Sequence, residues 1–176
     1  MIGNNSAKLI MALLDEQLVE EWLNSNNFFT IRGIKHGNNN EIDLLACRNQ
    51  NEKPEYWHAE VQVSYSPVAY ISNSSAKKRT LEEVKADIEG WVEKKFTSKN
   101  VTNKRNSIVP NVDWKFIFVH GVVKDARELD LIKDYGVEIV SYDSIINELI
   151  SNIHHKSSST ALSIVDLVKH IKKTGS

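Results

Sequence analysis

The stretch EIDLLACRNQNEKPEYWHAEVQVSY, residues 41–65, decides the fold because it reads as two strands with a polar loop between them. Residues 41–47 and 56–64 are largely apolar, and the polar segment 48–55 separates them. Pro54 has no amide proton to donate, so we expect it to help end the pairing of the two strands. Each strand nevertheless carries a carboxylate at its centre, Asp43 in the first and Glu60 in the second. These carboxylates direct the search for function.

Alternation of side chains predicts which face of the sheet these groups occupy. In the second strand, His58, Glu60, Gln62 and Ser64 share one face, opposite Trp57, Ala59, Val61 and Val63. In the first strand, Glu41, Asp43 and Leu45 share a face, opposite Ile42, Leu44 and Ala46. If the two strands are neighbours, Asp43 and Glu60 lie on the same side of the sheet.

Two carboxylates held together away from water repel each other by several kcal/mol, even at an effective dielectric constant of about 20. A divalent cation between them would relieve that repulsion. A site built from carboxylate oxygens without His or Cys favours Mg²⁺ or Mn²⁺ over zinc. Such ions usually complete their coordination with water and substrate phosphates, so the pair points to phosphate-ester chemistry.

Hydrophobic periodicity and turn residues predict the other elements. The predicted helices cover residues 7–25, 80–96, 125–134, a stretch that begins at Asp143, and 160–173. The predicted further strands cover residues 28–36, 114–123 and 136–141, and the polar segment 97–107 is expected to be a linker. Thr80 and Glu83 form a candidate capping box. The first three strands form an antiparallel meander and the rest a parallel crossover, which predicts an α/β fold with a mixed central sheet and helices on both faces.

Composition suits one folded domain over residues 1–176, with a core at about 7–152 and an extra C-terminal helix at about 160–173. Hydrophobic residues make up 41% of the chain, and no apolar run approaches the roughly 20 residues that span a bilayer. Acidic residues follow the start too closely for a signal peptide, so we expect a soluble cytoplasmic protein without a membrane partner. The lone Cys47 is expected to pack.

The order of the acidic residues resembles the PD-(D/E)XK nuclease superfamily, in particular its resolvase-like and Mrr-like branches. The resemblance lies in NEIDLLA, residues 40–46, followed by HAEVQVS, residues 58–64, and in Glu16, which precedes Trp22 and Leu23 in the first predicted helix. It implies a mixed sheet flanked by helices and Mg²⁺- or Mn²⁺-dependent cleavage of nucleic acid, with DNA favoured, in restriction, repair or phage defence. Asp43 and Glu60 would then be metal ligands, and Glu16 a further carboxylate of the site.

Gln62 departs from the family pattern, which has lysine at this position. Glutamine can hydrogen-bond and orient the attacking water but brings no charge to the phosphate. Two interpretations therefore stay open: an endonuclease that depends more heavily on its metal, or a catalytically decayed module that binds nucleic acid or a protein partner. A third is a small interaction or immunity protein in which the motif is accidental.

Charge suggests where nucleic acid would lie. Net charge is −1, but residues 1–62 hold five basic and nine acidic residues, whereas residues 77–105 hold nine basic and five acidic. Lys77, Lys78 and Arg79 precede the capping box and are candidate phosphate contacts, although a solvated helix start is the simpler alternative. Five more basic residues extend this charge: Lys94, Lys95, Lys99, Lys104 and Arg105. His154 and His155 are interpreted as an exposed turn. A homodimer would explain double-strand cleavage, but no interface can be read from the sequence.

Overall fold

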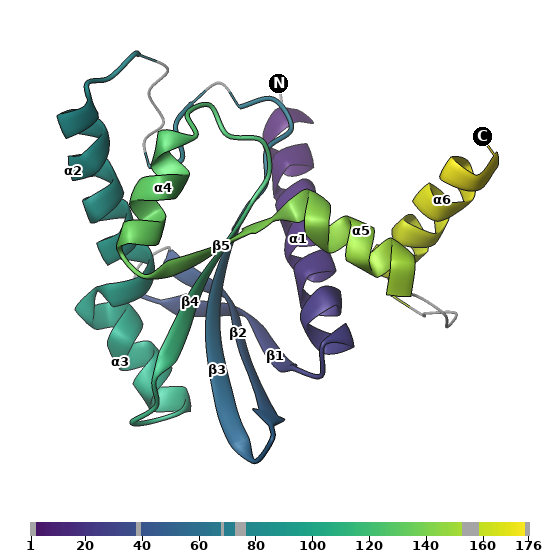
Figure 1. Cartoon of the computed structure of the whole chain (residues 1–176), viewed down its shortest axis with the longest axis horizontal. Helices are drawn as coiled ribbons and strands as arrows, with labels where there is room; N and C mark the ends of the chain where they lie inside the picture. The colour runs from purple at the N-terminus through teal and green to yellow at the C-terminus, as the bar shows by residue number, and fades with distance from the viewer. Residues whose placement is uncertain (1–2, 38–39, 68, 73–76, 153–158, 175–176) are drawn as a thin grey trace.

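A five-stranded mixed sheet forms the centre of the protein in the computed structural model, which describes residues 3–37, 40–67, 69–72, 77–152 and 159–174 (Figure 1). The strands are β1 (Phe29–His36), β2 (Asn40–Gln50), β3 (Lys53–Gln62), β4 (Trp114–His120) and β5 (Val137–Ser141), and they lie side by side in this order. The first three strands pair antiparallel, and β4 and β5 continue the sheet in parallel. The predicted mixed sheet is thus confirmed.

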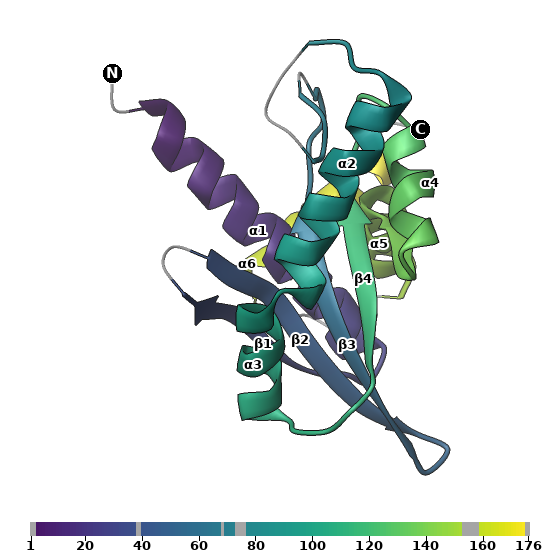
Figure 2. The ribbon, with the colours of Figure 1, turned by 90° about the vertical axis from the view of Figure 1, so that its left-hand side faces the viewer.

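Helices cover both faces of the sheet (Figures 1 and 2). They are α1 (Gly3–Ser25), α2 (Leu81–Val92), the π-helical turn η1 (Glu93–Thr97), α3 (Lys99–Ile108), α4 (Arg127–Asp134), α5 (Tyr142–Asn152) and α6 (Thr160–Thr174). On one face, α1, α5 and α6 enclose a core that includes Leu44, Ala59 and Ile117. On the other, α2, η1 and α4 pack over Phe118 and Val137. The predicted α/β fold class is confirmed.

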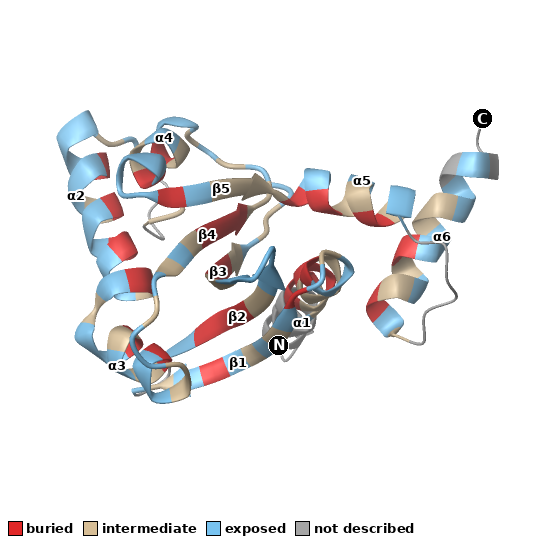
Figure 3. Cartoon of the chain, turned by 60° about the horizontal axis from the view of Figure 1, so that its bottom comes forward, coloured by how far each residue is buried: buried red, intermediate tan, exposed pale blue. Residues whose placement is uncertain are grey.

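Burial follows this layered arrangement, with the inner faces of the helices and the central strands shielded from solvent (Figure 3). In β4, for example, Ile117 and Val119 belong to the core under α1, whereas Phe118 belongs to the core under α2. None of the helices in the described part of the chain combines the length and apolar character that a transmembrane span needs.

The hairpin between β2 and β3 is longer and tighter than predicted. Asn51 and Glu52 form a two-residue turn with φ values of 52° and 64°, and pairing extends to Gln50 and Lys53. Pro54 pairs with Asn49, so the expectation that it ends the pairing within a loop at 48–55 is wrong. In an antiparallel ladder, every second pair of residues exchanges no hydrogen bonds. Asn49 and Pro54 form the second pair from the two-residue turn, which is a pair of this kind, so the missing amide proton of Pro54 costs no ladder hydrogen bond.

The segment 97–107 was expected to be a linker, and this expectation is wrong because Lys99–Ile108 form helix α3. Only Val101 and Arg105 of this helix are buried, which is too few inward positions to produce a clear apolar period. The predicted helix at 80–96 is present, with the predicted capping box of Thr80 and Glu83, but its last turn widens into the π-helical η1.

The sheet is irregular around Asp43. The β1–β2 ladder pairs Arg32 with Leu44 and Ile34 with Ile42, but it does not pair Gly33, which has φ 65°, with Asp43. Ile42 consequently packs with Leu45 and Val101 on the α3 side, whereas Leu44 packs under α1. Strict alternation, which placed Ile42 and Leu44 on one face, is therefore wrong at this point.

The β2–β3 ladder also ends here. Its last pair is Leu44 with Ala59, one residue short of Asp43 and Glu60, while β3 continues beside β4 as far as Gln62. In place of a ladder bond, the Val61 amide donates a hydrogen bond of 2.8 Å to Oδ2 of Asp43. The two strands part at the position where sequence analysis placed the functional carboxylates.

Candidate metal centre

Three carboxylates from three different elements converge where β2 and β3 part. Asp43 comes from β2, Glu60 from β3 and Glu16 from α1, and their exposed fractions are only 8%, 1% and 9%. An acidic side chain is rarely this buried unless a partner compensates its charge. The sequence predicted all three as site residues, and the fold brings them together.

The carboxylate oxygens of Glu16, Glu41 and Asp43 lie within 4.8 Å of one another, close enough to share one ion. Glu41, at the exposed start of β2, was not identified as a site residue from the sequence, although it lies two positions before Asp43. Glu60 lies beside this group but is not one of the three. We refer to Glu16, Glu41 and Asp43 as the acidic group.

The electrostatics of the acidic group favour a bound cation. Burial raises the pKa of Asp43 to about 7, and repulsion from Glu60 adds to this effect. Burial, followed by repulsion from Asp43 and Glu41, likewise raises the pKa of Glu16 to about 7, although the charge of Arg32 opposes this rise. A divalent cation would relieve this repulsion, and an all-carboxylate donor set suits a hard ion such as Mg²⁺ or Mn²⁺. The acidic group could therefore hold a divalent cation, and Mg²⁺ or Mn²⁺ as that cation stays a prediction.

Glu60 is held by two side chains that the sequence did not single out as site residues. Its Oε1 lies 2.9 Å from Nε2 of His58, and its Oε2 forms an ion pair with Nζ of Lys95. Behind His58, Nη1 of Arg105 lies 2.7 Å from Nδ1 of His58 and also donates to the carbonyl of Phe96. Because arginine only donates, Nδ1 of His58 accepts, and Nε2 carries the proton that is donated to Glu60.

His58 is therefore a neutral link in a buried chain of polar groups. Burial and the nearby Arg105 charge keep the pKa of His58 well below its usual value. Burial also raises the pKa of Glu60, and the charge of Lys95 opposes that rise. The chain from Arg105 through His58 fixes the orientation of Glu60 at the edge of the acidic group.

Lys95 is the cation that acts on both Glu60 and Asp43. Burial alone would lower the pKa of Lys95, but the charges of Glu60 and Asp43 outweigh burial and raise it. Lys95 lies in η1, where a regular helix was expected, so its orientation could not be obtained from a 3.6-residue period. The sequence placed it among several basic residues without distinguishing it.

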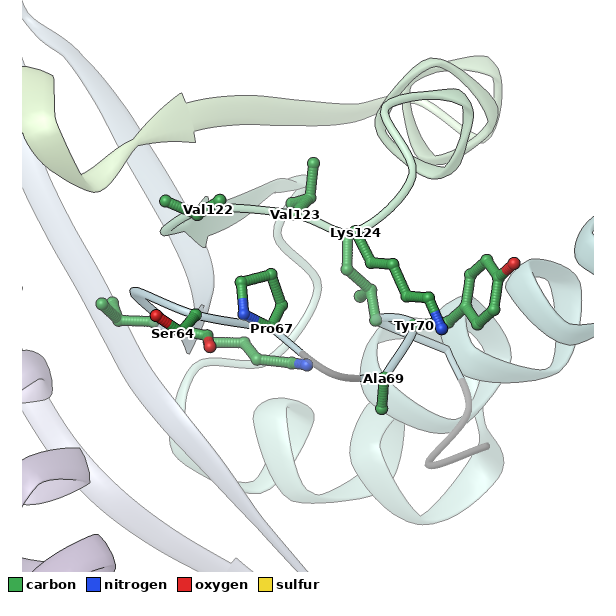
Figure 4. Close-up of a pocket in the computed structure, with 11 residues that line it drawn as sticks. Ser64, Pro67, Ala69, Tyr70, Val122, Val123 and Lys124 are labelled. Atoms are coloured by element: carbon green, nitrogen blue, oxygen red, sulfur yellow. The ribbon is translucent and has the colours of Figure 1, made fainter. Parts of the chain in front are cut away.

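Gln62 lies apart from this arrangement, at the last position of β3, where it pairs with His120 of β4. It is exposed and helps to line a cavity of about 400 Å³ with the segments that follow β3 and β4 (Figure 4). Gly121 allows these two segments to approach closely, because a Cβ at this position would lie only 2.6 Å from the carbonyl oxygen of Ser64. In this cavity Lys124 extends toward Tyr70, with its Nζ 4.7 Å from the ring centre.

The three basic residues before α2, which the sequence predicts as phosphate contacts, differ in their exposure to solvent. Lys77 and Lys78 are exposed, whereas Arg79 is partly buried, ion-paired with Asp87 and 5.5 Å from the ring centre of Tyr70. Arg79 is thus engaged within the protein, and nucleic-acid contact by these three residues stays a prediction. His154 and His155 lie outside the described residues.

No family model, no curated protein and no solved structure matches this chain, so its function is inferred from the site itself.

Proposed function

We propose that this protein is a metal-dependent endonuclease of the PD-(D/E)XK type that hydrolyses phosphodiester bonds in nucleic acid, with DNA as the favoured substrate. The observation that carries the proposal is the convergence of buried Glu16, Asp43 and Glu60 where β2 and β3 separate. An ordinary polar sheet face would have no reason to bury carboxylates beside one another, where burial, followed by their mutual repulsion, raises the pKa of Glu16 and of Asp43 to about 7.

In this proposal the acidic group holds Mg²⁺ or Mn²⁺, with Glu60 at its border. When bound, the metal would polarise the scissile phosphate and lower the pKa of a coordinated water. The chain contributes orientation: the Val61 amide fixes Asp43, and the His58 proton fixes Glu60. Such preorganisation matters because small displacements of a catalytic group reduce rates strongly.

The rival function, a decayed module that binds nucleic acid or a protein partner, is motivated by Gln62. The two functions differ in their response to metal. A working site gains stability when the ion binds the folded state, by about 2.7 kcal/mol at an ion concentration 100 times its dissociation constant. A decayed site would show no such Mg²⁺-linked stabilisation.

Cleavage is tested by incubating the purified protein with supercoiled DNA, and in parallel with RNA, in the presence of Mg²⁺ or Mn²⁺. We expect nicking or cutting that EDTA stops and that Asp43→Asn and Glu60→Gln each abolish. Glu55→Gln is the matched control, because Glu55 pairs with Arg48 in the β2–β3 hairpin and takes no part in the site. Equal cleavage by the wild type and both site variants would reject the proposal, as would a wild type that neither cleaves nor gains stability from the metal.

A further inference from the structure

A second cavity adjoins the acidic group on the side of η1. It has a volume of about 260 Å³ and is lined by His36, Asn40, Glu41, Lys94 and Lys95. We infer that this cavity binds a phosphate of the nucleic-acid backbone and that Lys95 supplies there the positive charge that Gln62 lacks. The inference rests on the proposed nuclease function and assigns the substrate contacts of that site.

The cavity adjoins both the acidic group and Glu60. Glu41 belongs both to the cavity and to the acidic group, and Lys95 both lines the cavity and forms the ion pair with Glu60. A water molecule occupies roughly 30 Å³ of liquid, so the space admits a phosphate group together with some of its hydration. A phosphate bound here would lie beside the carboxylates that are proposed to hold the metal.

Charge and hydrogen bonding on this side suit an anion. Burial lowers the pKa of His36, and the nearby charges of Lys95 and Lys104 lower it further, so two cations act on this side of the cavity. The Nδ1 atom of His36 is buried and has no hydrogen-bond partner among the described residues. Glu41 is the one acidic side chain of the lining, and a cation in the acidic group would offset its charge.

The local backbone holds Lys95 at the cavity. The Ser98 amide donates to the Glu93 carbonyl at 2.7 Å, the i to i+5 bond that defines a π-helical turn. The next residue, Phe96, is fully buried and its carbonyl accepts a hydrogen bond from Arg105. Lys95 is thus anchored at its base, while its ammonium group has three donors and can contact Glu60 and a phosphate oxygen together.

This position suits the charge that develops during hydrolysis. A water oxygen forms a new bond to phosphorus while the bond to the leaving sugar oxygen breaks, the water gives up a proton, and the leaving oxygen gains one. Negative charge accumulates on the phosphate oxygens in the transition state. Lys95 stays protonated throughout and stabilises this charge as a hydrogen-bond donor, without taking part in proton transfer.

The test uses the full chain and three variants: Lys95→Gln, Lys95→Arg and Lys94→Gln. Lys133→Gln is the control, because Lys133 is an exposed lysine on α4 whose ion pair is with Asp130. Cleavage is measured with Mg²⁺. Binding of a short DNA duplex is measured separately without metal over a range of salt concentrations, and circular dichroism monitors folding.

We expect Lys95→Gln to reduce kcat by about 10²- to 10³-fold, the usual effect of removing one preorganised donor. Lys95→Arg should retain part of the rate, because it keeps a positive charge at this position. In binding, Lys94→Gln and Lys95→Gln should each reduce the slope of log K against log salt by about 0.9, the value for one phosphate contact.

The binding measurement decides the inference independently of cleavage. If the wild type binds DNA but does not cleave it, the nuclease proposal fails, whereas a reduced salt slope in the two variants would still support the phosphate site. A salt slope in Lys94→Gln and Lys95→Gln equal to that of Lys133→Gln would overturn the inference, as would full cleavage by Lys95→Gln. If Lys95→Gln does not fold, Lys94→Gln tests the same cavity.

Discussion

Neutralising Asp43 should stabilise the metal-free protein near neutral and alkaline pH. The pKa of Asp43 rises from 3.8 to about 7 on folding, a change of about three units. Each unit corresponds to about 1.4 kcal/mol, so the ionised carboxylate costs the folded state about 4 kcal/mol. This is an upper value, because neighbouring side chains rearrange around a buried charge. Asp43→Asn removes the charge and keeps an oxygen that can accept from the Val61 amide.

The sign of the pH dependence follows from this raised pKa. The folded protein holds the Asp43 proton more tightly than the unfolded chain does. The favourable contribution is therefore complete below about pH 4 and is lost as the pH rises to about 7. The advantage of Asp43→Asn should accordingly be largest near pH 8 and small near pH 4. At about 2–4 °C per kcal/mol, an advantage of about 4 kcal/mol corresponds to a melting temperature about 8–16 °C higher near pH 8, which is the upper limit for this variant.

Urea unfolding in EDTA at both pH values measures this difference, with Asp134→Asn on the exposed surface of α4 as the matched control. Added Mg²⁺ should narrow the difference between the two proteins, because only the wild type gains stability from the ion. A variant that is less stable than the wild type near pH 8, or equally favoured at both pH values, would refute the electrostatic reasoning. Equal Mg²⁺ stabilisation of both proteins would place the ion elsewhere.

Three further predictions concern the buried support of Glu60 and the stability of the fold elsewhere. Arg105→Met should lower the free energy of unfolding by about 3 kcal/mol in urea titrations, because it leaves buried His58 without its donor; a loss below about 1 kcal/mol would contradict this role. Glu52→Gly should raise the free energy of unfolding by roughly 0.5–1 kcal/mol, because φ at Glu52 is 64°; no gain would mean that the turn is not strained. Glu128→Ala should speed hydrogen exchange at the backbone amides of Ile71 and Ser72, which donate to its buried carboxylate, and should lower the free energy of unfolding by about 2 kcal/mol. Unchanged exchange at these amides would refute the contact.

Features of the fold that depend on local pattern could be predicted from the sequence. The alternation of apolar and polar residues identified the strands, and Thr80 with Glu83 marked the start of α2. The prediction for Pro54 was wrong because a proline is accepted in a strand wherever its position needs no amide donor. Which positions these are depends on the location of the turn, and the turn at Asn51 and Glu52 contains no glycine that would mark it in the sequence. Helix α3 was missed because tertiary burial of Val101 and Arg105, rather than a repeated apolar period, holds it.

The site divides in the same way between local and long-range features. Asp43 and Glu60 could be predicted because both lie on strands that are consecutive in sequence. The roles of Lys95 and Arg105 could not, because they depend on a π-helical turn and on a helix that returns to the sheet more than 30 residues later in the chain. Glu41 carried a usable signal, since it lies two residues before Asp43, and its carboxylate oxygen lies within 4.8 Å of those of Asp43 and Glu16.

The parting of β2 from β3 gives the centre two sides of opposite charge. Continued pairing beyond Leu44 and Ala59 would satisfy the backbone but leave no space between the strands; here the Asp43 carboxylate accepts the Val61 amide instead. The acidic group gathers on the α1 side, Lys94 and Lys95 lie on the η1 side, and Glu60 contacts Lys95 at the boundary. Phosphodiester hydrolysis needs both kinds of surface, one that holds a cation and one that holds the phosphate. A glutamine at position 62 is compatible with such a centre because the positive charge reaches it from the helical layer instead of from the strand.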